Sequence, residues 1–153
     1  MPAKVPIQEI IDALQMHFEE IACFIDLESG RVECISSATL RDAEDGEPSG
    51  LLPEWQKRER ETAERIVSTD RFVALPSQFD VDEWSMMQEF ALSRETERAR
   101  NGLLGAISGA GAFRRFKEAV RREGIEMEWF SFRDKAFREF AVEWCSENDI
   151  AWW

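Results

Sequence analysis

Hydrophobic positions recur at helical spacing along most of this chain and form β-type runs in only three short segments. Two β-rich runs occupy residues 22–36, and we expect Glu28, Ser29 and Gly30 to form the loop of a hairpin between them. The helical pattern that precedes this hairpin follows Pro6, with apolar residues at Ile7, Ile10, Ile11, Leu14, Phe18 and Ile21. The N-terminal third therefore predicts one helix followed by a two-stranded hairpin.

The middle of the chain is more polar. Residues 41–50 are acidic and contain two glycines and a proline, so we expect an acidic loop there. Pro53 then opens a charged helix over residues 54–67, whose thin apolar stripe predicts a place on the surface. A short apolar run over residues 71–75 ends at Pro76 and supplies a third strand.

Helical patterns return in the second half of the chain. Asp80 followed by Glu83 is typical of a helix N-terminus. The next helix, over residues 95–107, ends at the glycine-rich segment 108–111.

The C-terminal segment combines helical patterns with many aromatic residues. Phe113 and Phe116 are spaced for core packing on a helix that stops at Gly124. Residues 126–130 predict an extended stretch, and Ser131 predicts the N-cap of the last helix.

Together these elements predict an α+β fold, with a small antiparallel three-stranded sheet packed with several α-helices in a single domain over residues 1–153. The chain has the size of one ordinary domain. No apolar run reaches the roughly 18 residues that a membrane helix needs. The N-terminus also lacks the apolar core of a signal peptide, so we expect a cytoplasmic protein without membrane contact.

The formal net charge of −12 is unevenly distributed. Residues 1–50 hold 3 basic and 11 acidic side chains, whereas residues 101–153 hold 8 and 9. A field of this sign repels phosphate backbones, which disfavours non-specific binding of nucleic acid.

The chain has three cysteines and one histidine, but no CxxC pair and no His/Cys cluster with the ligand spacing of the usual zinc sites. Our hairpin register places Cys23 and Cys34 on opposite faces, so we expect free buried thiols there and at Cys145. His17 lies at the edge of the first apolar stripe and is better explained as a boundary residue than as part of a catalytic pair. We therefore expect no metal, no cofactor and no catalytic residues.

Five basic side chains gather on the helix that follows the glycine-rich segment. Arg114, Lys117 and Arg121 stand at positions i, i+3 and i+7, and Arg115 and Arg122 flank them. Basic residues after such a turn can bind an anion or contact nucleic acid. In the structural alternative, the glycines let two helices approach and the basic side chains pair with neighbouring carboxylates. We favour the structural role and keep all five as candidate contacts.

Tryptophan is abundant, at six residues, whereas tyrosine is absent. Trp55 lies on the charged helix, and Trp152 and Trp153 end the chain, so the pattern does not place these three in the core. Exposed tryptophans often anchor protein interfaces, which makes them candidate partner contacts. Alternatively, the C-terminal pair folds back and covers the sheet.

Four segments carry a family resemblance: FIDLESGRVECI, RFVALPSQFDVDEWSMMQEFA, GAGAFRRFKEAV and WFSFRDKAFREFAVEWCSENDI. On these segments the chain is similar to the bacterial uncharacterised protein family 0158, over about residues 5–150. Trp129-Phe130 stands where the family pattern has Trp-Tyr, so any role of that phenolic hydroxyl is absent here. The resemblance implies a small bacterial cytoplasmic protein and supplies no reaction or catalytic residue.

The lack of a catalytic set beside abundant aromatic residues favours a non-enzymatic protein-interaction module, whose partner is another protein or a second copy of the chain. The alternative is a nucleic-acid-associated regulatory factor that uses the basic helix. The third hypothesis is a carboxylate- or metal-dependent hydrolase, since the chain has many carboxylates. It ranks last because the sequence does not group these carboxylates into a recognisable site.

Overall fold

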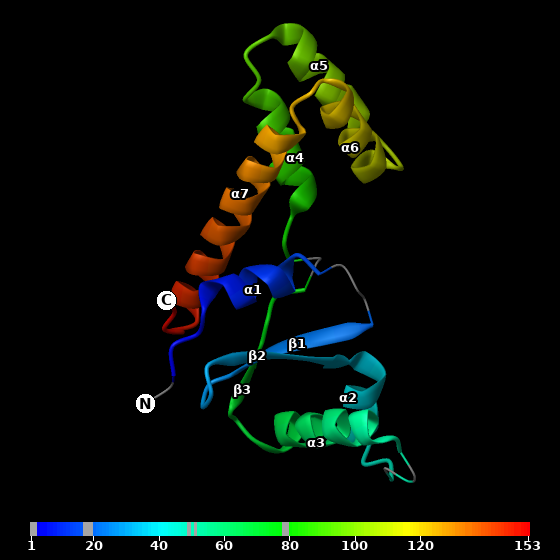
Figure 1. The fold of residues 1–153 in the computed structure, drawn as a ribbon, viewed down its shortest axis with the longest axis vertical. Helices are drawn as coiled ribbons and strands as arrows, with labels where there is room; N and C mark the ends of the chain where they lie inside the picture. The colour runs from blue at the N-terminus through cyan, green and yellow to red at the C-terminus, as the bar shows by residue number, and fades with distance from the viewer. Residues whose placement is uncertain (1–2, 17–19, 49, 51, 78–79) are drawn as a thin grey trace. The chain divides into compact units, whose positions relative to one another are not determined.

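The computed structural model describes residues 3–16, 20–48, 50, 52–77 and 80–153. In chain order its elements are α1 (Ile7–Leu14), β1 (Ile21–Asp26), β2 (Arg31–Ser36), α2 (Ser37–Glu44), α3 (Glu54–Ser68), β3 (Phe72–Ala74), α4 (Glu83–Leu92), α5 (Glu97–Ala106), α6 (Ala112–Arg122) and α7 (Glu126–Glu147) (Figure 1). The strands form an antiparallel sheet in the order β2-β1-β3. The predicted α+β fold with a three-stranded sheet is confirmed.

Backbone contacts divide the chain into two compact units. The mixed unit comprises residues 1–80 and 141–153 and holds the sheet with α1, α2 and α3. The helical unit comprises residues 81–140, which include α4, α5 and α6. Residues 126–140 of α7 belong to the helical unit, and the remainder of α7 belongs to the mixed unit. Folding as a single domain stays a prediction.

The loop of the β1–β2 hairpin is one residue longer than the sequence predicts. Asp26 pairs with Arg31, which leaves residues 27–30 in the loop. Gly30 has a φ of 73°, and a Cβ there would lie 2.5 Å from the carbonyl oxygen of Lys4, so the position requires glycine. The extra loop residue shifts the strand register by one, and such a shift exchanges the two faces of a strand.

A buried carboxylate joins the hairpin to the residue before β3. Asp26 is only 3% exposed, and its two oxygens accept hydrogen bonds from Nε and Nη2 of Arg71 at 2.7 and 2.5 Å. It also accepts from the backbone N–H groups of Glu28 and Ser29. The Arg71 guanidinium holds the pKa of Asp26 well below its ordinary value and outweighs the opposing effect of burial, with a smaller contribution from the turn N–H groups. The Asp26–Arg71 pair therefore depends on a charged carboxylate.

Aromatic rings form the interior of the helical unit. Phe90 of α4 lies 6.2 Å from Phe116 of α6 and 5.4 Å from Trp129 of α7, measured between ring centroids. Phe116 and Trp129 are 4.8 Å apart, and Phe132 lies 5.4 Å from Phe90. These four contacts are edge to face, the arrangement that aromatic quadrupoles favour. One aromatic cluster thus joins three helices.

The first and last helices differ from their predicted bounds. α1 ends at Leu14 and not near Ile21, because Ile21 pairs with Ser36 as the first residue of β1. The predicted extended stretch over 126–130 is wrong, since these residues begin α7 and Ser131 lies inside that helix. Glutamates in the first turn of α7 interact favourably with the helix dipole.

Two further predictions fail at helix ends. The first four residues of the predicted loop over 41–50 belong to α2. The N-cap of α4 is Asp82 and not Asp80: the Asp82 carboxylate accepts from the N–H of Ser85 at 3.0 Å. Asp80 instead accepts from the N–H of Ser77 at 2.8 Å. Hydrogen bonds from the hydroxyl and N–H of Ser85 lower the pKa of Asp82, as expected for a charged cap.

Candidate functional site

An acidic segment and an exposed tryptophan share the α2–α3 helix pair, whose two helices pack on each other in the mixed unit (Figure 1). Residues 42–56 carry five carboxylates and no basic side chain. Trp55, in the first turn of α3, is 65% exposed, so its ring is accessible to a partner. We name the exposed carboxylates and the exposed tryptophan of residues 42–56 the acidic tryptophan face: Asp42, Glu44, Asp45, Glu47, Glu54 and Trp55.

A buried arginine holds the acidic segment to α3. Arg60 is 7% exposed; its Nη2 donates to the carbonyl oxygen of Glu47, and its Nε pairs with Glu64 at 3.2 Å. A buried guanidinium requires such partners, because desolvation of an unpaired charge is costly. The backbone of the acidic segment is therefore tied to α3, while its carboxylates point outward.

Glu59 ties α3 to the start of α2. Its Oε1 accepts from the N–H of Ser36 at 2.5 Å, and its Oε2 accepts from the hydroxyl of Thr39 at 3.3 Å. Ser36 is also the N-cap of α2, since its hydroxyl accepts from the N–H of Ala38. A carboxylate on the N–H of an N-cap residue is the arrangement of a capping box, here supplied by a different helix. These bonds fix the helix pair that carries the acidic tryptophan face.

The two C-terminal tryptophans are placed differently. Trp152 forms a parallel β-bridge with Val5 and is half-buried, whereas Trp153 is 69% exposed. The N–H of Trp153 donates to the carbonyl of Val5 at 3.0 Å, and the N–H of Ile7 donates to the carbonyl of Trp153 at 2.9 Å. The tail thus folds back along the N-terminal segment and leaves the Trp153 indole exposed. Within the described part of the chain, the backbone hydrogen bonds of the tail are with Val5 and Ile7 and not with the strands of the sheet.

Arg115 of the basic helix is engaged inside the helical unit. Its guanidinium donates to three carbonyl oxygens of the turn between α5 and α6, those of Ala106, Ser108 and Ala110. Gly111 begins α6 with a φ of 77°, a conformation that suits glycine. The partners of Arg115 are therefore backbone carbonyls and not the neighbouring carboxylates that the structural alternative predicts.

The other four basic residues, Arg114, Lys117, Arg121 and Arg122, are exposed on α6. Arg121 lies 3.3 Å from Glu126, so one of these charges is paired at the surface. Phe113 on the same helix is 50% exposed, and its predicted place in the core is wrong. The buried face of α6 is instead centred on Ala112, Phe116, Ala119 and Val120, which leaves Phe113 at its edge.

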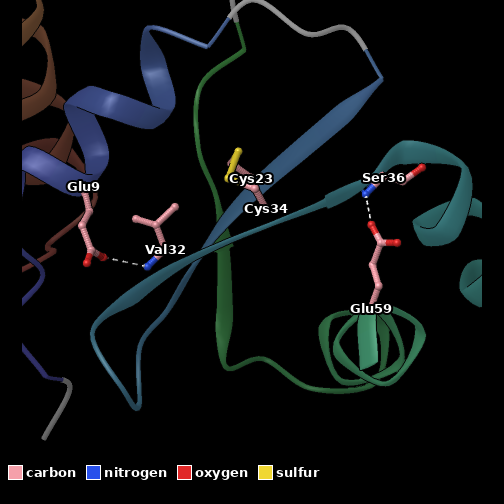
Figure 2. The surroundings of a disulfide bond; sticks show 6 residues. All are labelled: Glu9, Cys23, Val32, Cys34, Ser36 and Glu59. Carbon is pink, nitrogen blue, oxygen red and sulfur yellow. Dashed lines mark hydrogen bonds between the residues drawn. A yellow bond between two sulfur atoms is a disulfide. The ribbon is translucent and has the colours of Figure 1, made fainter. Parts of the chain in front are cut away.

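Cys23 and Cys34 form a disulfide bond between β1 and β2, contrary to the predicted free thiols (Figure 2). They are direct partners in the strand register, with Cα atoms 4.1 Å apart. The carbonyl of Cys23 accepts from the N–H of Leu75, so the Cys23–Cys34 pair belongs to the class without mutual backbone bonds, in which side chains lie closest. A four-residue loop, which sequence reasoning missed, would have placed the two cysteines opposite each other.

The third cysteine behaves as predicted. Cys145 is a free thiol that is fully buried, and burial raises its pKa. Over the described ranges, no group of three or more His, Cys, Asp or Glu side chains is placed to hold a metal ion. None of the described helices combines the length and the apolar character needed to cross a membrane. His17 lies outside the described residues.

No curated protein and no solved structure showed significant similarity to the chain. The model of an Uncharacterised protein family (UPF0158) matches residues 1–152, and thus both units. The chain belongs to this family. Membership of UPF0158 confirms the resemblance of the four sequence segments. The description of UPF0158 names no activity.

Proposed function

We propose that this UPF0158 protein is a non-enzymatic module of the bacterial cytoplasm that binds a basic segment of another protein through the acidic tryptophan face. The observation that supports the proposal is the 65% exposure of Trp55 next to a stretch of five carboxylates without a basic residue. Large exposed aromatic side chains are over-represented among the residues that dominate binding energy.

The charge distribution favours a basic partner over a second copy of the chain. The mixed unit holds 8 basic and 20 acidic side chains, whereas the helical unit holds 11 of each. The whole net charge of −12 therefore belongs to the mixed unit. Two such units repel each other, while a lysine- or arginine-rich segment is attracted and guided to the face.

The face offers two kinds of contact to such a segment. The carboxylates can pair with lysine or arginine side chains, and these pairs set orientation and association rate more than affinity. The indole of Trp55 can cover the aliphatic part of a lysine or arginine side chain and attract its charge through the ring. We expect the tryptophan to provide most of the affinity and the carboxylates to provide the preference for a basic sequence.

The test uses a synthetic peptide with alternating lysine, arginine and leucine residues, and a second peptide with glutamate at every basic position. Calorimetric titration of the full chain should show binding of the basic peptide only, weakening as salt concentration rises. Trp55→Ala should weaken binding by about tenfold or more. Trp153→Ala, which removes an equally exposed indole elsewhere, is the matched control and should change binding little.

Equal binding by wild-type and Trp55→Ala protein would contradict the proposal, as would equal affinity for the two peptides. Sedimentation at high protein concentration separates the remaining alternative. A stable dimer that Trp55→Ala dissociates would show that a second copy occupies this face.

A second candidate function is supported by Phe113. Its half-exposed ring stands next to Arg114 and near Lys117 on a unit with no net charge, and ring and cations together suit single-stranded nucleic acid. Titration with short duplex and single-stranded oligonucleotides at low salt decides this alternative. Binding that is lost in Lys117→Glu supports it, and no binding at low salt rejects it.

A further inference from the structure

The disulfide joins the central strand of the sheet to a well-anchored edge strand. β2 is an edge strand, and its outward N–H groups at Val32 and Ser36 are occupied by carboxylates. The N–H of Val32 donates to Glu9 of α1 at 3.3 Å, and the N–H of Ser36 donates to Glu59 of α3. Figure 2 shows these two bonds on either side of Cys34. α1 and α3 therefore hold β2 in place from outside the sheet.

Pairing between β1 and β2 does not depend on the disulfide. The pairs Ala22 with Ile35 and Phe24 with Glu33 flank the cysteines directly, and the register continues over the full length of both strands. β1 is also paired with β3 on its other side. Because both strands are held by these contacts, the two sulfur atoms should stay opposite each other when the bond between them is broken.

The two cysteine residues differ in exposure. Cys34 is exposed on the edge strand, whereas Cys23 is half-buried on the central strand. Thiol–disulfide exchange requires direct approach of a thiolate to one sulfur, so access decides which sulfur is attacked. Cys145 provides a contrast within the same chain, since it is 0% exposed.

We propose that Cys23 and Cys34 form a reversible thiol–disulfide exchange site that reacts with an external dithiol. A thiolate of the dithiol attacks Sγ of Cys34, the Sγ–Sγ bond breaks, and Cys23 leaves as a thiolate that takes a proton from water. The second thiolate of the reductant then attacks its own sulfur in the mixed disulfide and releases Cys34, which is protonated in turn. Two electrons pass to the cysteine pair, and the dithiol becomes a disulfide.

The reverse reaction uses the same geometry. The Cys34 thiolate attacks one sulfur of the oxidised dithiol, which forms a mixed disulfide and frees the other sulfur of the dithiol as a thiolate. The Cys23 thiolate, held opposite by the strand pairing, then attacks Sγ of Cys34, re-forms the Sγ–Sγ bond and releases the reduced dithiol. The intramolecular step is favoured because the two thiols are already positioned. The cysteine pair is therefore oxidised or reduced according to the ratio of oxidised to reduced dithiol around it, while the strand register of the sheet stays unchanged.

The first test equilibrates the folded full chain with mixtures of reduced and oxidised dithiothreitol, and then alkylates it with N-ethylmaleimide for mass analysis. We expect alkylation of Cys23 and Cys34 in the reduced state, none at Cys145, an unchanged far-ultraviolet circular dichroism spectrum, and return of the disulfide with oxidised dithiothreitol. Labelling of Cys145 in step with the other two would overturn the proposal, because the bond would then open only on unfolding. Failure of the bond to re-form would overturn it as well.

The second test compares Cys23→Ser, which leaves Cys34, with Cys34→Ser, which leaves Cys23. With oxidised glutathione as the probe, the Cys34 thiol should form a mixed disulfide about tenfold faster than the Cys23 thiol, because it is the more accessible one. Equal or reversed rates would contradict the assignment of Cys34 as the attacked sulfur. The order of alkylation in the reduced wild-type chain gives the same information if either variant fails to fold.

Discussion

The mixed unit and the helical unit use the same residue types for different purposes. In the helical unit, Phe90, Phe116 and Trp129 form one aromatic cluster, and the guanidinium of Arg115 donates hydrogen bonds to backbone carbonyls. The mixed unit leaves the indole of Trp55 exposed and carries the whole net charge of −12. Composition alone does not distinguish these uses. The comparison indicates that the aromatic cluster of the helical unit maintains the fold, whereas the exposed indole of Trp55 in the mixed unit is available for recognition.

The largest effect should come from the aromatic cluster. Phe116→Ala removes a fully buried ring and should lower the free energy of unfolding by about 3–5 kcal/mol, since it loses burial and leaves a cavity. Trp55→Ala removes an exposed ring and should change the free energy of unfolding by about 0.5 kcal/mol or less. Urea unfolding of both variants measures the contrast. Similar losses of unfolding free energy in the two variants would contradict the different roles assigned to the buried ring of the helical unit and the exposed ring of the mixed unit.

The Asp26–Arg71 pair should have the next largest effect. Asp26→Asn keeps the shape of the side chain but removes its charge, and should cost about 2 kcal/mol at neutral pH. The pKa of Asp26 is lower in the folded chain, so its contribution is present above the unfolded value of about 4. That contribution is lost as the pH falls from there toward the folded pKa.

Urea unfolding at a series of pH values below 5 measures this effect. The stability of the wild-type chain should fall more steeply with pH than that of Asp26→Asn. Glu28→Gln is the matched control, since Glu28 is the exposed partner of Arg71 at 3.3 Å and should contribute little. Parallel pH profiles for wild type and Asp26→Asn would contradict the role of the pair.

A smaller effect separates two neighbouring arginines of the helical unit. Arg115→Met leaves three carbonyl oxygens without their donor and should cost about 1–2 kcal/mol. Arg114→Met changes an exposed side chain and should cost about 0.5 kcal/mol or less. Thermal unfolding of the two variants checks the difference. If Arg115→Met and Arg114→Met unfold at the same temperature, the carbonyl contacts of Arg115 contribute little, and Arg115 becomes a candidate ligand contact like Arg114.

The architecture could be predicted from periodicity, but registers and boundaries could not. The hairpin, the charged helix α3 and the third strand follow from local patterns. One residue in the hairpin loop decided whether Cys23 and Cys34 face each other, and Gly30 alone does not reveal whether the loop has three or four residues. A disulfide was therefore missed through an error of one position.

The exposure of individual aromatic residues also could not be predicted from the helical spacing of apolar positions. Phe113 and Phe116 both fit a helical stripe, but only the packing of α6 shows that Phe116 enters the cluster and that Phe113 stays at its edge. Ser131 resembles an N-cap, yet it lies inside α7 because that helix starts directly after the turn at Gly124. The helical spacing of a residue therefore does not fix its exposure, and a serine does not by itself mark the start of a helix.

Nuclear magnetic resonance of the indole N–H groups of the six tryptophans, during titration with the basic peptide, tests directly where the peptide binds. The signals are assigned by single Trp→Phe substitutions. We expect the Trp55 signal to shift in proportion to the peptide bound, while the signal of the buried Trp129 stays unchanged. An unchanged Trp55 signal in the presence of bound peptide would contradict the central claim that the acidic tryptophan face is the binding surface.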